Sequence, residues 1–507
     1  MQKLNTANSF SKLLCFTKKH PEAICGVLCA LAFLLVLWDV SAVSTFTIGF
    51  SILVIIAIWL CMQGELNSSN LIALLFLAGF VLRLQYILYT GCTQRQHDVE
   101  TFGNGCGHAG YIEYFFSELK LPDFDVREVW QFYHPPLHHI ISAIFLKICK
   151  LLGIAYSTAL EGLQVLTLYY SSLCMIISYK IFRELKIKGN ALVIAFVIIA
   201  FHPTFIIFAG SINNDILSIT FQLAAVLYTI RWMKNKTVTN IVCIALAIGL
   251  GMMTKLSAWM VAPAVAIVFL YALIKGLKSG QHKWSFFIKQ YSVFALVCVP
   301  LGLWWSIRNY VLHSVPPNYI PFLNYDNPQY IGNISVFKRL FDFGLHQFES
   351  VFDMWGKPYY EYNPTIGLLK TAMFGESIND VAYPQISIFG TALFWIGTLL
   401  AVVGFMCIMY YLFSCKHKKS ISDVLLLMVY GVNLVMYYYF CISFAFTCTQ
   451  NIRYATPLIL IGAVYIGKTI KCSPEKGKFT KCYTLLINAA VVLFATFTTI
   501  TYTLIGI

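Results

Sequence analysis

The feature that most constrains this chain is a series of long apolar runs that fill most of its length. A helix needs about 20 apolar residues to cross the hydrocarbon core of a bilayer. Backbone polar groups in lipid must be satisfied inside the chain, which favours helices, whereas a strand barrel shows short alternating segments. We therefore predict an all-α polytopic membrane protein with about 13 transmembrane helices. They are expected near residues 21–40, 45–63, 70–90, 159–182, 190–208, 215–233, 238–254, 258–276, 286–305, 386–413, 421–444, 451–469 and 483–505.

Basic residues gather in short clusters between the apolar runs. The net charge is +14, but the cations lie on no soluble domain, so we expect no nucleic-acid partner. Cytoplasmic loops of membrane proteins carry the excess of lysine and arginine, and a cytoplasmic N-terminus puts every cluster on that side. The clusters are Lys3/Lys12/Lys18/Lys19, Lys180/Arg183/Lys186/Lys188, Arg231/Lys234/Lys236, Lys275/Lys278/Lys283, Lys416/Lys418/Lys419 and Lys471/Lys476/Lys478/Lys481.

The apolar segment 138–152 decides this orientation, because a crossing there would move every later basic cluster outward. At about 100° per residue, His139, Ser142, Lys147 and Lys150 fall on one stripe, and the isoleucines and leucines fall opposite. A helix with two such faces lies in the membrane interface. We expect this segment on the outer surface and not across the bilayer.

Two long polar loops then face outward, at residues 91–158 and 306–385. Together they hold 14 of the 22 acidic residues, and no internal repeat is visible. We predict an N-terminal part, residues 1–69, with two additional transmembrane helices. A catalytic membrane domain is expected at 70–470, and a basic loop with the last helix at 471–507.

The first long loop holds the strongest candidates for chemistry. His97, Asp98 and Glu100 follow a helix end closely, and a carboxylate at the membrane surface is suited to act as a general base on a hydroxyl. Solvation of ordinary loop acids is the plain alternative. The sequence HPPL, which begins at His134, weighs against it: proline fixes φ and restrains the preceding residue, so the corner is rigid and returns the loop to the lipid surface.

Single charged residues stand near several outer helix ends. Lys255, Arg308 and Arg453 lie there, and the turn 213–215 adds two asparagines and an aspartate. Charged groups near helix ends often snorkel. The functional alternative is that these cations converge on a phosphate, which arginine contacts in bidentate fashion. In the second loop, aromatic residues near Glu376 suit a sugar or headgroup, but equally an interfacial belt.

Several sequence phrases occur in one order: the HDVETFG loop around Asp98, HPPL, NDILS, TKLSA, WWSIRNY, LLKTAMFGE and IRYATP. As an ordered set they resemble the membrane glycosyltransferases of the GT-C class, especially the protein O-mannosyltransferase (family 39) and aminoarabinose transferase families, over residues 70–470. In those families the first extracytoplasmic loop carries the catalytic aspartate, which the resemblance places at Asp98. The Asp-Glu pair of the mannosyltransferases is not kept, since Val99 follows; Glu100 or Glu113 is the candidate second acid.

The resemblance implies a polyprenyl-phosphate sugar donor and a reaction on the extracytoplasmic face. We expect Asp98 to take the proton of an acceptor hydroxyl, on a lipid, glycan or protein, as it attacks the anomeric carbon with inversion. Cations stabilise the departing phosphate. The residues expected to bind substrate are His97, His134, Lys255, Arg308, Glu376 and Arg453.

No cofactor is predicted, and no required metal, because the loop histidines lack convincing ligand spacing. We expect a multi-pass protein of the cell membrane, with the endoplasmic reticulum membrane as the alternative. A transporter or flippase of a lipid-linked or small polar substrate is the alternative function, because polar residues near helix ends also mark transport proteins.

Overall fold

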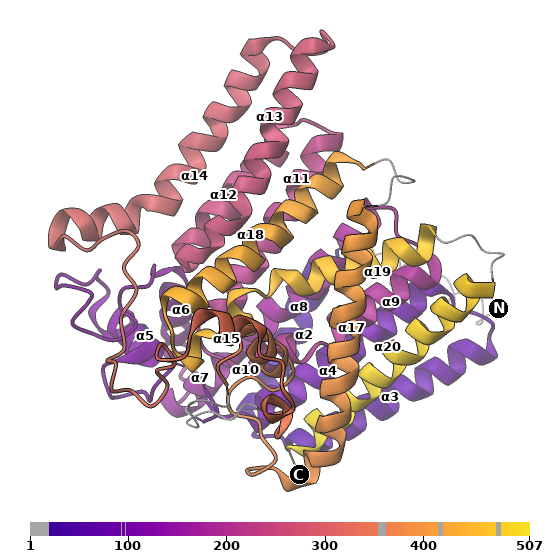
Figure 1. Cartoon of the computed structure of the whole chain (residues 1–507). Helices are drawn as coiled ribbons and strands as arrows, with labels where there is room; N and C mark the ends of the chain where they lie inside the picture. Colours follow the sequence, from indigo (N-terminus) through magenta and orange to yellow (C-terminus); the bar gives the residue numbers. More distant parts are fainter. Residues whose placement is uncertain are drawn as a thin grey trace, which may run out of the picture.

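The computed structural model describes residues 20–92, 94–96, 98–352, 361–413, 419–472 and 478–506. Over these residues the chain is a bundle of helices (Figure 1), and its one β feature there is an isolated antiparallel bridge between Tyr330 and Phe446. The predicted all-α membrane class is confirmed. The N-terminal lysines and the cations at 416, 418 and 476 lie outside the described residues.

The helix bounds follow the apolar runs of the sequence. The α-helices are α2 (Pro21–Leu37), α3 (Ala42–Met62), α4 (Ser68–Tyr89), α5 (Gly107–Glu118), α6 (Leu137–Leu151), α7 (Tyr156–Gly162), α8 (Gln164–Glu184), α9 (Gly189–Ala200), α10 (Pro203–Gly210), α11 (Asp215–Lys234), α12 (Val238–Thr254), α13 (Ala262–Lys278), α14 (Trp284–His313), α15 (Val336–Phe341), α16 (Pro364–Phe374), α17 (Ser387–Phe413), α18 (Ile421–Ser443), α19 (Pro457–Cys472) and α20 (Lys478–Leu504). Short 3₁₀ helices are η1 (Leu256–Val261), η2 (Leu345–Phe348), η3 (Pro384–Ile386), η4 (Thr447–Thr449) and η5 (Ile452–Tyr454).

Nine helices of the described part are long and apolar enough to cross a membrane. The pair α9 and α10 makes a tenth if it is one span, bent by 40° at its break. The three remaining predicted runs form α2 and α12, of 17 residues each, and α19, of 16 residues. Every predicted run therefore coincides with a helix, but the predicted count of thirteen spans is not confirmed.

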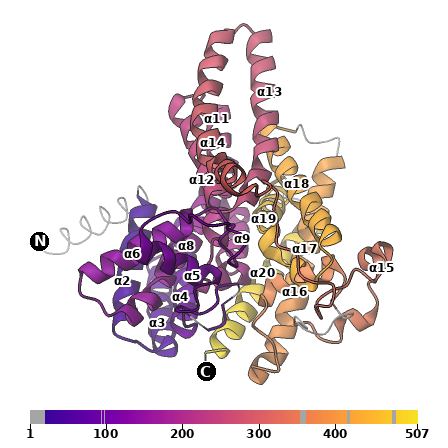
Figure 2. The same ribbon diagram turned by 90° about the vertical axis from the view of Figure 1, so that its left-hand side faces the viewer.

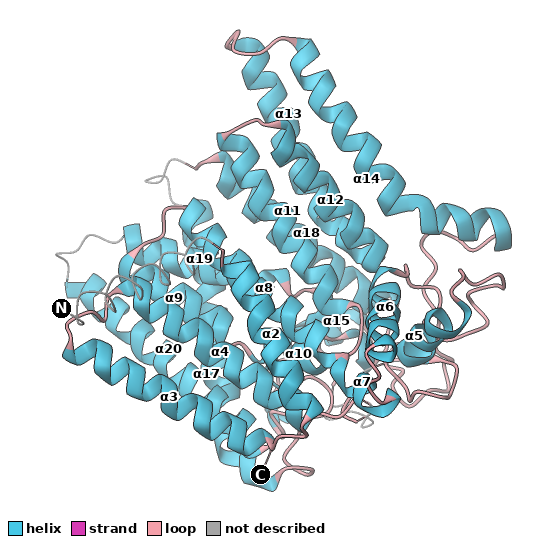
Figure 3. Ribbon diagram, turned by 180° about the vertical axis from the view of Figure 1, so that it is seen from behind, coloured by secondary structure: helices cyan, strands magenta, loops and turns pink. Residues whose placement is uncertain are grey.

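The helices are grouped around two ends of the molecule. In Figure 1 the tip between α13 and α14 projects at one end, while α5, α6, α7 and α15 gather in the lower part of the view. The view from behind, Figure 3, shows α3, α4 and α20 at the side away from that tip. The α13–α14 tip carries Lys275, Lys278 and Lys283, so one basic cluster lies far from both long loops.

Segment 138–152 forms α6, a helix of 15 residues that is not among the candidate spans. Its polar face, with His138, His139 and Ser142, is buried against the protein. Its apolar face is open: Ile144 is 54% exposed and Leu151 is 85% exposed. A helix that buries polar residues and exposes apolar ones suits contact with lipid, in agreement with the predicted interfacial position.

The break between α9 and α10 is stabilised by an arginine inside the bundle. Arg83 of α4 is fully buried, and its guanidinium donates to the carbonyl oxygens of Ala200 at 2.6 Å, Ile199 at 3.3 Å and Gly79 at 2.8 Å, and to Ser171 Oγ at 2.9 Å. The last carbonyl oxygens of a helix lack intrahelical hydrogen-bond donors. Arg83 donates to two of these oxygens at the end of α9. The break lets α10 turn and end at Gly210, just before the polar turn that opens α11.

We expect Arg83→Met to lower the free energy of unfolding by about 2–4 kcal/mol, because several buried acceptors lose their donor. The measurement is the thermal midpoint in detergent. Ser171→Ala is the matched control, since it removes a single partner of the same guanidinium and should cost less. An unchanged midpoint for Arg83→Met would contradict this role.

Candidate active site

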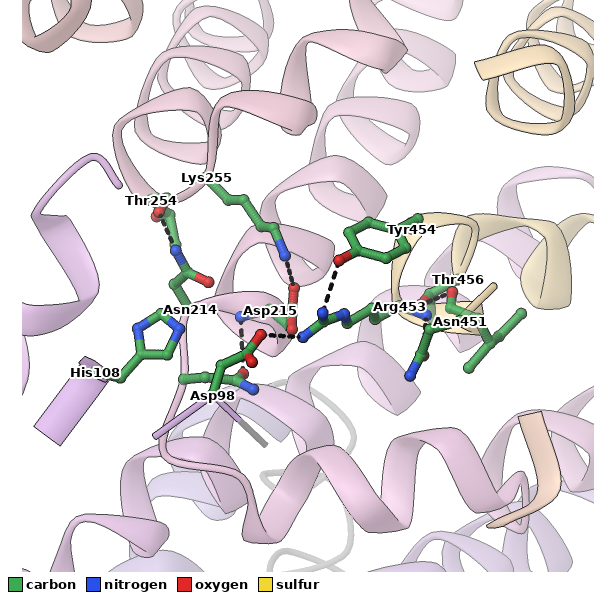
Figure 4. Close-up of polar contacts among 12 residues, drawn as sticks. Asp98, His108, Asn214, Asp215, Thr254, Lys255, Asn451, Arg453, Tyr454 and Thr456 are labelled. Carbon is green, nitrogen blue, oxygen red and sulfur yellow. Dashed lines mark hydrogen bonds and ion pairs between the residues drawn. The ribbon is translucent and has the colours of Figure 1, made fainter. Parts of the chain in front are cut away.

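Four segments that are far apart in the sequence meet at one polar centre (Figure 4). Nη1 of Arg453, in η5, donates to Oδ2 of Asp98, in the first long loop, at 2.7 Å. Lys255, after α12, forms an ion pair with Asp215, at the start of α11. Both cations face the ring of Tyr454, at 4.8 Å for Arg453 and 5.3 Å for Lys255. Two carboxylate–cation pairs therefore lie next to one shared tyrosine.

Asp98 is positioned by a constrained turn of the backbone. Asp98 and Glu100 both have left-handed backbone angles, with φ of 57° and 60°, and Val99 between them is fully buried. The turn is tied to α5, because the backbone nitrogen of Ala109 donates to the Val99 carbonyl at 2.9 Å. A Cβ at Gly107, which has φ of 71°, would lie 2.5 Å from the Val99 oxygen, so only glycine fits there. Unusual backbone angles of this kind are frequent at functional sites.

Asp215 is positioned by the polar turn between α10 and α11. Its backbone nitrogen donates to Oδ1 of Asn213 at 3.1 Å, and Nδ2 of Asn214 donates to the Thr254 carbonyl at 3.0 Å. The second of these bonds joins the start of α11 to the end of α12, where Lys255 follows. Asp215 is 3% exposed, and a buried carboxylate needs a partner charge, which Lys255 provides.

A pocket lies beside the polar centre. Its lining includes Asp215, Arg453, Glu376 and a second arginine, Arg95. The Arg95 guanidinium lies 4.2 Å from the ring centroid of Tyr89, and its Nε donates to the Tyr383 hydroxyl at 2.9 Å. Within the described part of the chain no carboxylate forms an ion pair with Arg95. The pocket therefore has a cation whose charge is not neutralised by a protein acid there.

A second, apolar cavity borders this pocket. It is lined by residues of α9, α16, α17, α18, α19 and α20, among them Gly397, Gly404 and Gly462, and it shares Ile452 with the polar pocket. Gly404 and Gly462 let α17 and α19 approach each other closely, and Gly397 packs against Met373 of α16. The polar pocket and the apolar cavity thus meet at Ile452.

Three buried histidines, His108, His138 and His139, and the half-buried His134 stand on the loop side of the centre. Nδ1 of His108 and Nε2 of His139 are 2.8 Å apart, and His134 stacks on His108 with a centroid distance of 5.5 Å. Burial lowers the pKa of His108 to about 3 and that of His138 to about 4, and it holds the pKa of His134 and His139 well below 6.5. All four imidazoles are therefore neutral at pH 7.

No group of three or more His, Cys, Asp or Glu side chains in the described ranges is arranged to hold a metal ion. The histidines pair with each other and with aromatic rings, and Asp98 and Asp215 are paired with cations. The expectation that no metal is required stays a prediction, and we derive no step through one.

The buried histidines give a pH dependence of stability. A histidine whose pKa is lowered by folding stabilises the native state fully above pH 6.5, and that contribution is lost as pH falls toward the lowered pKa. At pH 5, each imidazole that the fold keeps neutral lowers the free energy of unfolding by roughly 2 kcal/mol relative to its value above pH 6.5. We expect the thermal midpoint in detergent to fall between pH 7.5 and pH 5, and to fall less in His138→Gln. Equal losses in both proteins would contradict the assignment of His138.

The structure brings together three of the predicted site residues, Asp98, Lys255 and Arg453. Glu376 lies on the same pocket, where its Oε1 accepts a hydrogen bond from Asn451. His134 reaches the edge of the centre through its stacking on His108.

Three other predicted residues have different partners. Glu100 is exposed and is not among the residues that line the polar pocket. Glu113 accepts from the Gly103 nitrogen at 2.6 Å and from the Tyr156 hydroxyl at 2.9 Å, so it fastens the loop. Arg308 donates to the Pro122 carbonyl and to Oδ1 of its neighbour in α14. His97 lies outside the described residues, and the role of each stays a prediction.

Sequence reasoning did not single out Arg95 or Tyr454, and it did not foresee that Asp215 pairs with Lys255. Two local signals were available: Arg95 stands three residues before Asp98, and Tyr454 directly follows Arg453. Neither signal shows that the residues converge, because Asp98 and Arg453 are 355 positions apart.

A family profile described as dolichyl-phosphate-mannose-protein mannosyltransferase matches residues 133–305 of this chain. The matched stretch includes His134, Asp215 and Lys255 but neither Asp98 nor Arg453. A comparison with curated proteins found no significant match.

Solved structures of two membrane proteins are similar at low identity. ArnT from Cupriavidus metallidurans bound to undecaprenyl phosphate is 12% identical, with 87% of this chain and 77% of that chain covered and a TM-score of 0.49. The archaeal oligosaccharyltransferase AglB from Archaeoglobus fulgidus, in complex with an inhibitory peptide and a dolichol-phosphate, is 13% identical, with 85% of this chain covered and a TM-score of 0.44. The chain spans 55% of AglB.

The profile match covers the phrases HPPL, NDILS and TKLSA, and over that stretch the chain resembles the protein O-mannosyltransferases. The resemblance supports a membrane glycosyltransferase. The roles of the site residues rest on the geometry described above.

Proposed function

We propose that this protein transfers a sugar from a polyprenyl-phosphate donor to an acceptor hydroxyl on the extracytoplasmic face of a membrane. The observation that carries the proposal is the Asp98–Arg453 pair beside a pocket that also contains Arg95 and that borders an apolar cavity at Ile452. Such a transfer needs a base for the acceptor, cations for the departing phosphate and apolar space for the carrier chain. The arrangement offers all three.

Asp98 is the proposed base. It accepts the proton of the acceptor hydroxyl while that oxygen attacks the anomeric carbon of the sugar. The bond between this carbon and the phosphate oxygen breaks, and polyprenyl phosphate leaves with the electron pair. A single displacement inverts the anomeric configuration.

Arg95 and Arg453 are the proposed phosphate ligands, because both line the polar pocket and arginine suits bidentate phosphate contact. Lys255 contributes less, since Asp215 already neutralises it. Fixed cations at the position where negative charge develops lower the barrier without reorganisation at the moment of reaction. Arg308 is held by Pro122 and is given no direct role.

The pair of Asp98 and Arg453 implies an order of binding. Arg453 holds one oxygen of the proposed base, and its buried Nε has no hydrogen-bond partner among the described residues. A donor phosphate between Arg95 and Arg453 competes with Asp98 for the guanidinium and leaves the carboxylate oxygen open to the acceptor. The donor is therefore expected to bind before the acceptor.

The face of the membrane is proposed from helix α11. Asp215 begins this helix, and Arg231 and Lys234 lie in its last turn. Its 20 residues span about 30 Å, the thickness of the hydrocarbon core. The site and a basic cluster thus lie at opposite ends of one span, and the positive-inside rule supports a site outside the cytoplasm. We assign the protein to the cell membrane, with the active site on that outer face.

The proposal is tested with purified protein in detergent and a panel of polyprenyl-phosphate sugars, with free polyprenyl phosphate as the measured product. Release that requires the active protein and an acceptor is expected. A transporter or flippase leaves the sugar–phosphate bond intact. Absence of release across the panel, combined with uptake of the intact lipid-linked sugar into proteoliposomes, would overturn the proposal in favour of transport.

A further inference from the structure

The second long loop contains a segment that turns its apolar side chains away from the protein. We call residues 336–345 the aromatic segment; it comprises α15 and the turn that follows. Phe337 is 75% exposed, Phe341 63% and Leu345 89%, and the two phenylalanine rings are 5.0 Å apart. Phe343 is also more than half exposed. A contiguous apolar patch of this kind marks an interaction surface.

Two polar side chains of the same segment, Arg339 and Asp342, face the protein, whereas the exposed Lys338 lies 5.5 Å from the ring centroid of Tyr362. Arg339 is 2% exposed and donates to the Cys441 carbonyl of α18. Oδ2 of Asp342 accepts from the Tyr362 hydroxyl at 2.5 Å, and Nδ2 of Asn363 donates to the Asp342 carbonyl at 2.7 Å. The segment is therefore fastened in this orientation, with its polar side inward and its apolar side outward.

The residues that follow the aromatic segment reach a membrane span. Phe348, at the end of η2, lies 5.5 Å from the ring of Trp395 in α17, and Trp395 is 48% exposed. Ile388, at the start of α17, is 80% exposed. The chain that directly follows the aromatic segment therefore contacts the exposed side of α17.

The length of α17 places this contact near the edge of the bilayer. Its 27 residues extend for about 40 Å, which exceeds the hydrocarbon core by about 10 Å. Trp395 lies eight residues after Ser387, about 12 Å along the helix. Trp395 thus lies near the loop-side end of this span, and tryptophan is enriched toward the ends of membrane spans.

We propose that the aromatic segment docks on the lipid surface of the leaflet next to the candidate site, with Phe337 and Phe341 inserted among the lipids. The tethers to Tyr362 and Asn363 join it to the start of α16, the helix that brings Thr371 and Phe374 to the polar pocket. The lipid surface thereby supports the pocket through α16. This proposal does not depend on the reaction proposed above.

The second apolar face next to the site agrees with this placement. Figure 2 shows α6 and α15 at opposite edges of the molecule. The exposed apolar side chains of α6, among them Ile148 and Leu151, face away from the protein as those of α15 do. A membrane surrounds the protein on all sides, so apolar faces are expected at opposite edges of the molecule. The apolar faces of α6 and α15 meet this expectation.

The test is photo-crosslinking in native membranes with p-benzoylphenylalanine placed at Phe337 and, in a second variant, at Phe341. Lipid-sized mass additions on the labelled peptide are measured by mass spectrometry. Leu296 of α14, which is 74% exposed, is the positive control within a span. Tyr325 is the matched control, since it lies on the same loop and is 66% exposed. Its ring contacts Tyr330, which pairs with Phe446 just after the end of α18.

Lipid adducts at 337 and 341 that reach the level of position 296, and exceed that of position 325 several-fold, are expected. Adducts at both positions no higher than at 325 would overturn the proposal. Crosslinks of twice the chain mass would also overturn it, because they would show a second copy on this face instead of lipid.

Discussion

Asp98→Asn is expected to lower turnover of a polyprenyl-phosphate sugar by about 10²–10⁴-fold, the usual contribution of a general base. Asparagine is nearly the same size and accepts the left-handed backbone angle found at this position. It can still accept a hydrogen bond from Arg453, so the fold and the donor-binding pocket are retained. The measurement is the initial rate of polyprenyl phosphate release together with the thermal midpoint.

Glu100→Gln is the matched control for this prediction. Glu100 is a carboxylate two residues further on, in the same turn and with a similar φ of 60°, but it is exposed. Its neutralisation is expected to change turnover little. Unchanged turnover in Asp98→Asn would remove Asp98 from the mechanism, and a large loss in Glu100→Gln would identify it as the second acid.

Arg453→Met is expected to abolish measurable turnover and to lower the free energy of unfolding by about 3 kcal/mol, since its removal leaves the half-buried Asp98 carboxylate without its partner. Arg453 is 9% exposed as a side chain and faces Asp98, and Tyr454 loses a donor at 2.7 Å. Binding of a polyprenyl phosphate should weaken as well, because one of two arginines in the pocket is lost. The measurements are turnover, the thermal midpoint and the dissociation constant of the lipid phosphate.

A double substitution separates the two losses. In Asp98→Asn combined with Arg453→Met the unpaired carboxylate is gone, so the thermal midpoint should recover part of the loss of Arg453→Met, while turnover stays absent. The coupling energy from this cycle measures the pair directly. A double variant whose loss of stability equals the sum of the two single losses would contradict an energetic pair between these side chains.

Arg95 offers an independent check of the phosphate site. It binds Tyr383 and Tyr89 but no described carboxylate, so Arg95→Gln leaves no acid without a partner in that part of the chain. It should raise the dissociation constant of the lipid phosphate while the thermal midpoint changes less than in Arg453→Met. A tight complex in Arg95→Gln would show that the phosphate lies elsewhere.

The sequence by itself determined the membrane class and the position of the long apolar helices, but not the loop helices α5, α15 and α16. Length and apolarity are local properties, and a run of apolar residues in lipid has few alternatives to a helix. The two-faced pattern of 138–152 likewise fixed α6, because its stripes follow from residue spacing alone. Asp98 was found because the first long loop concentrates polar residues and because its phrase resembles a known family.

Only the tertiary structure decided which charged residues act together. Arg453 and Arg308 look alike in sequence, as single cations near outer helix ends, yet one pairs with Asp98 and the other is fastened to Pro122. Asp215 and Lys255 are 40 positions apart, and their pairing depends on how α11 and α12 pack. The physical reason is that a helix end has no preferred partner of its own: the partner is chosen by the packing of the long apolar surfaces, and the charges at their ends are brought together as a consequence.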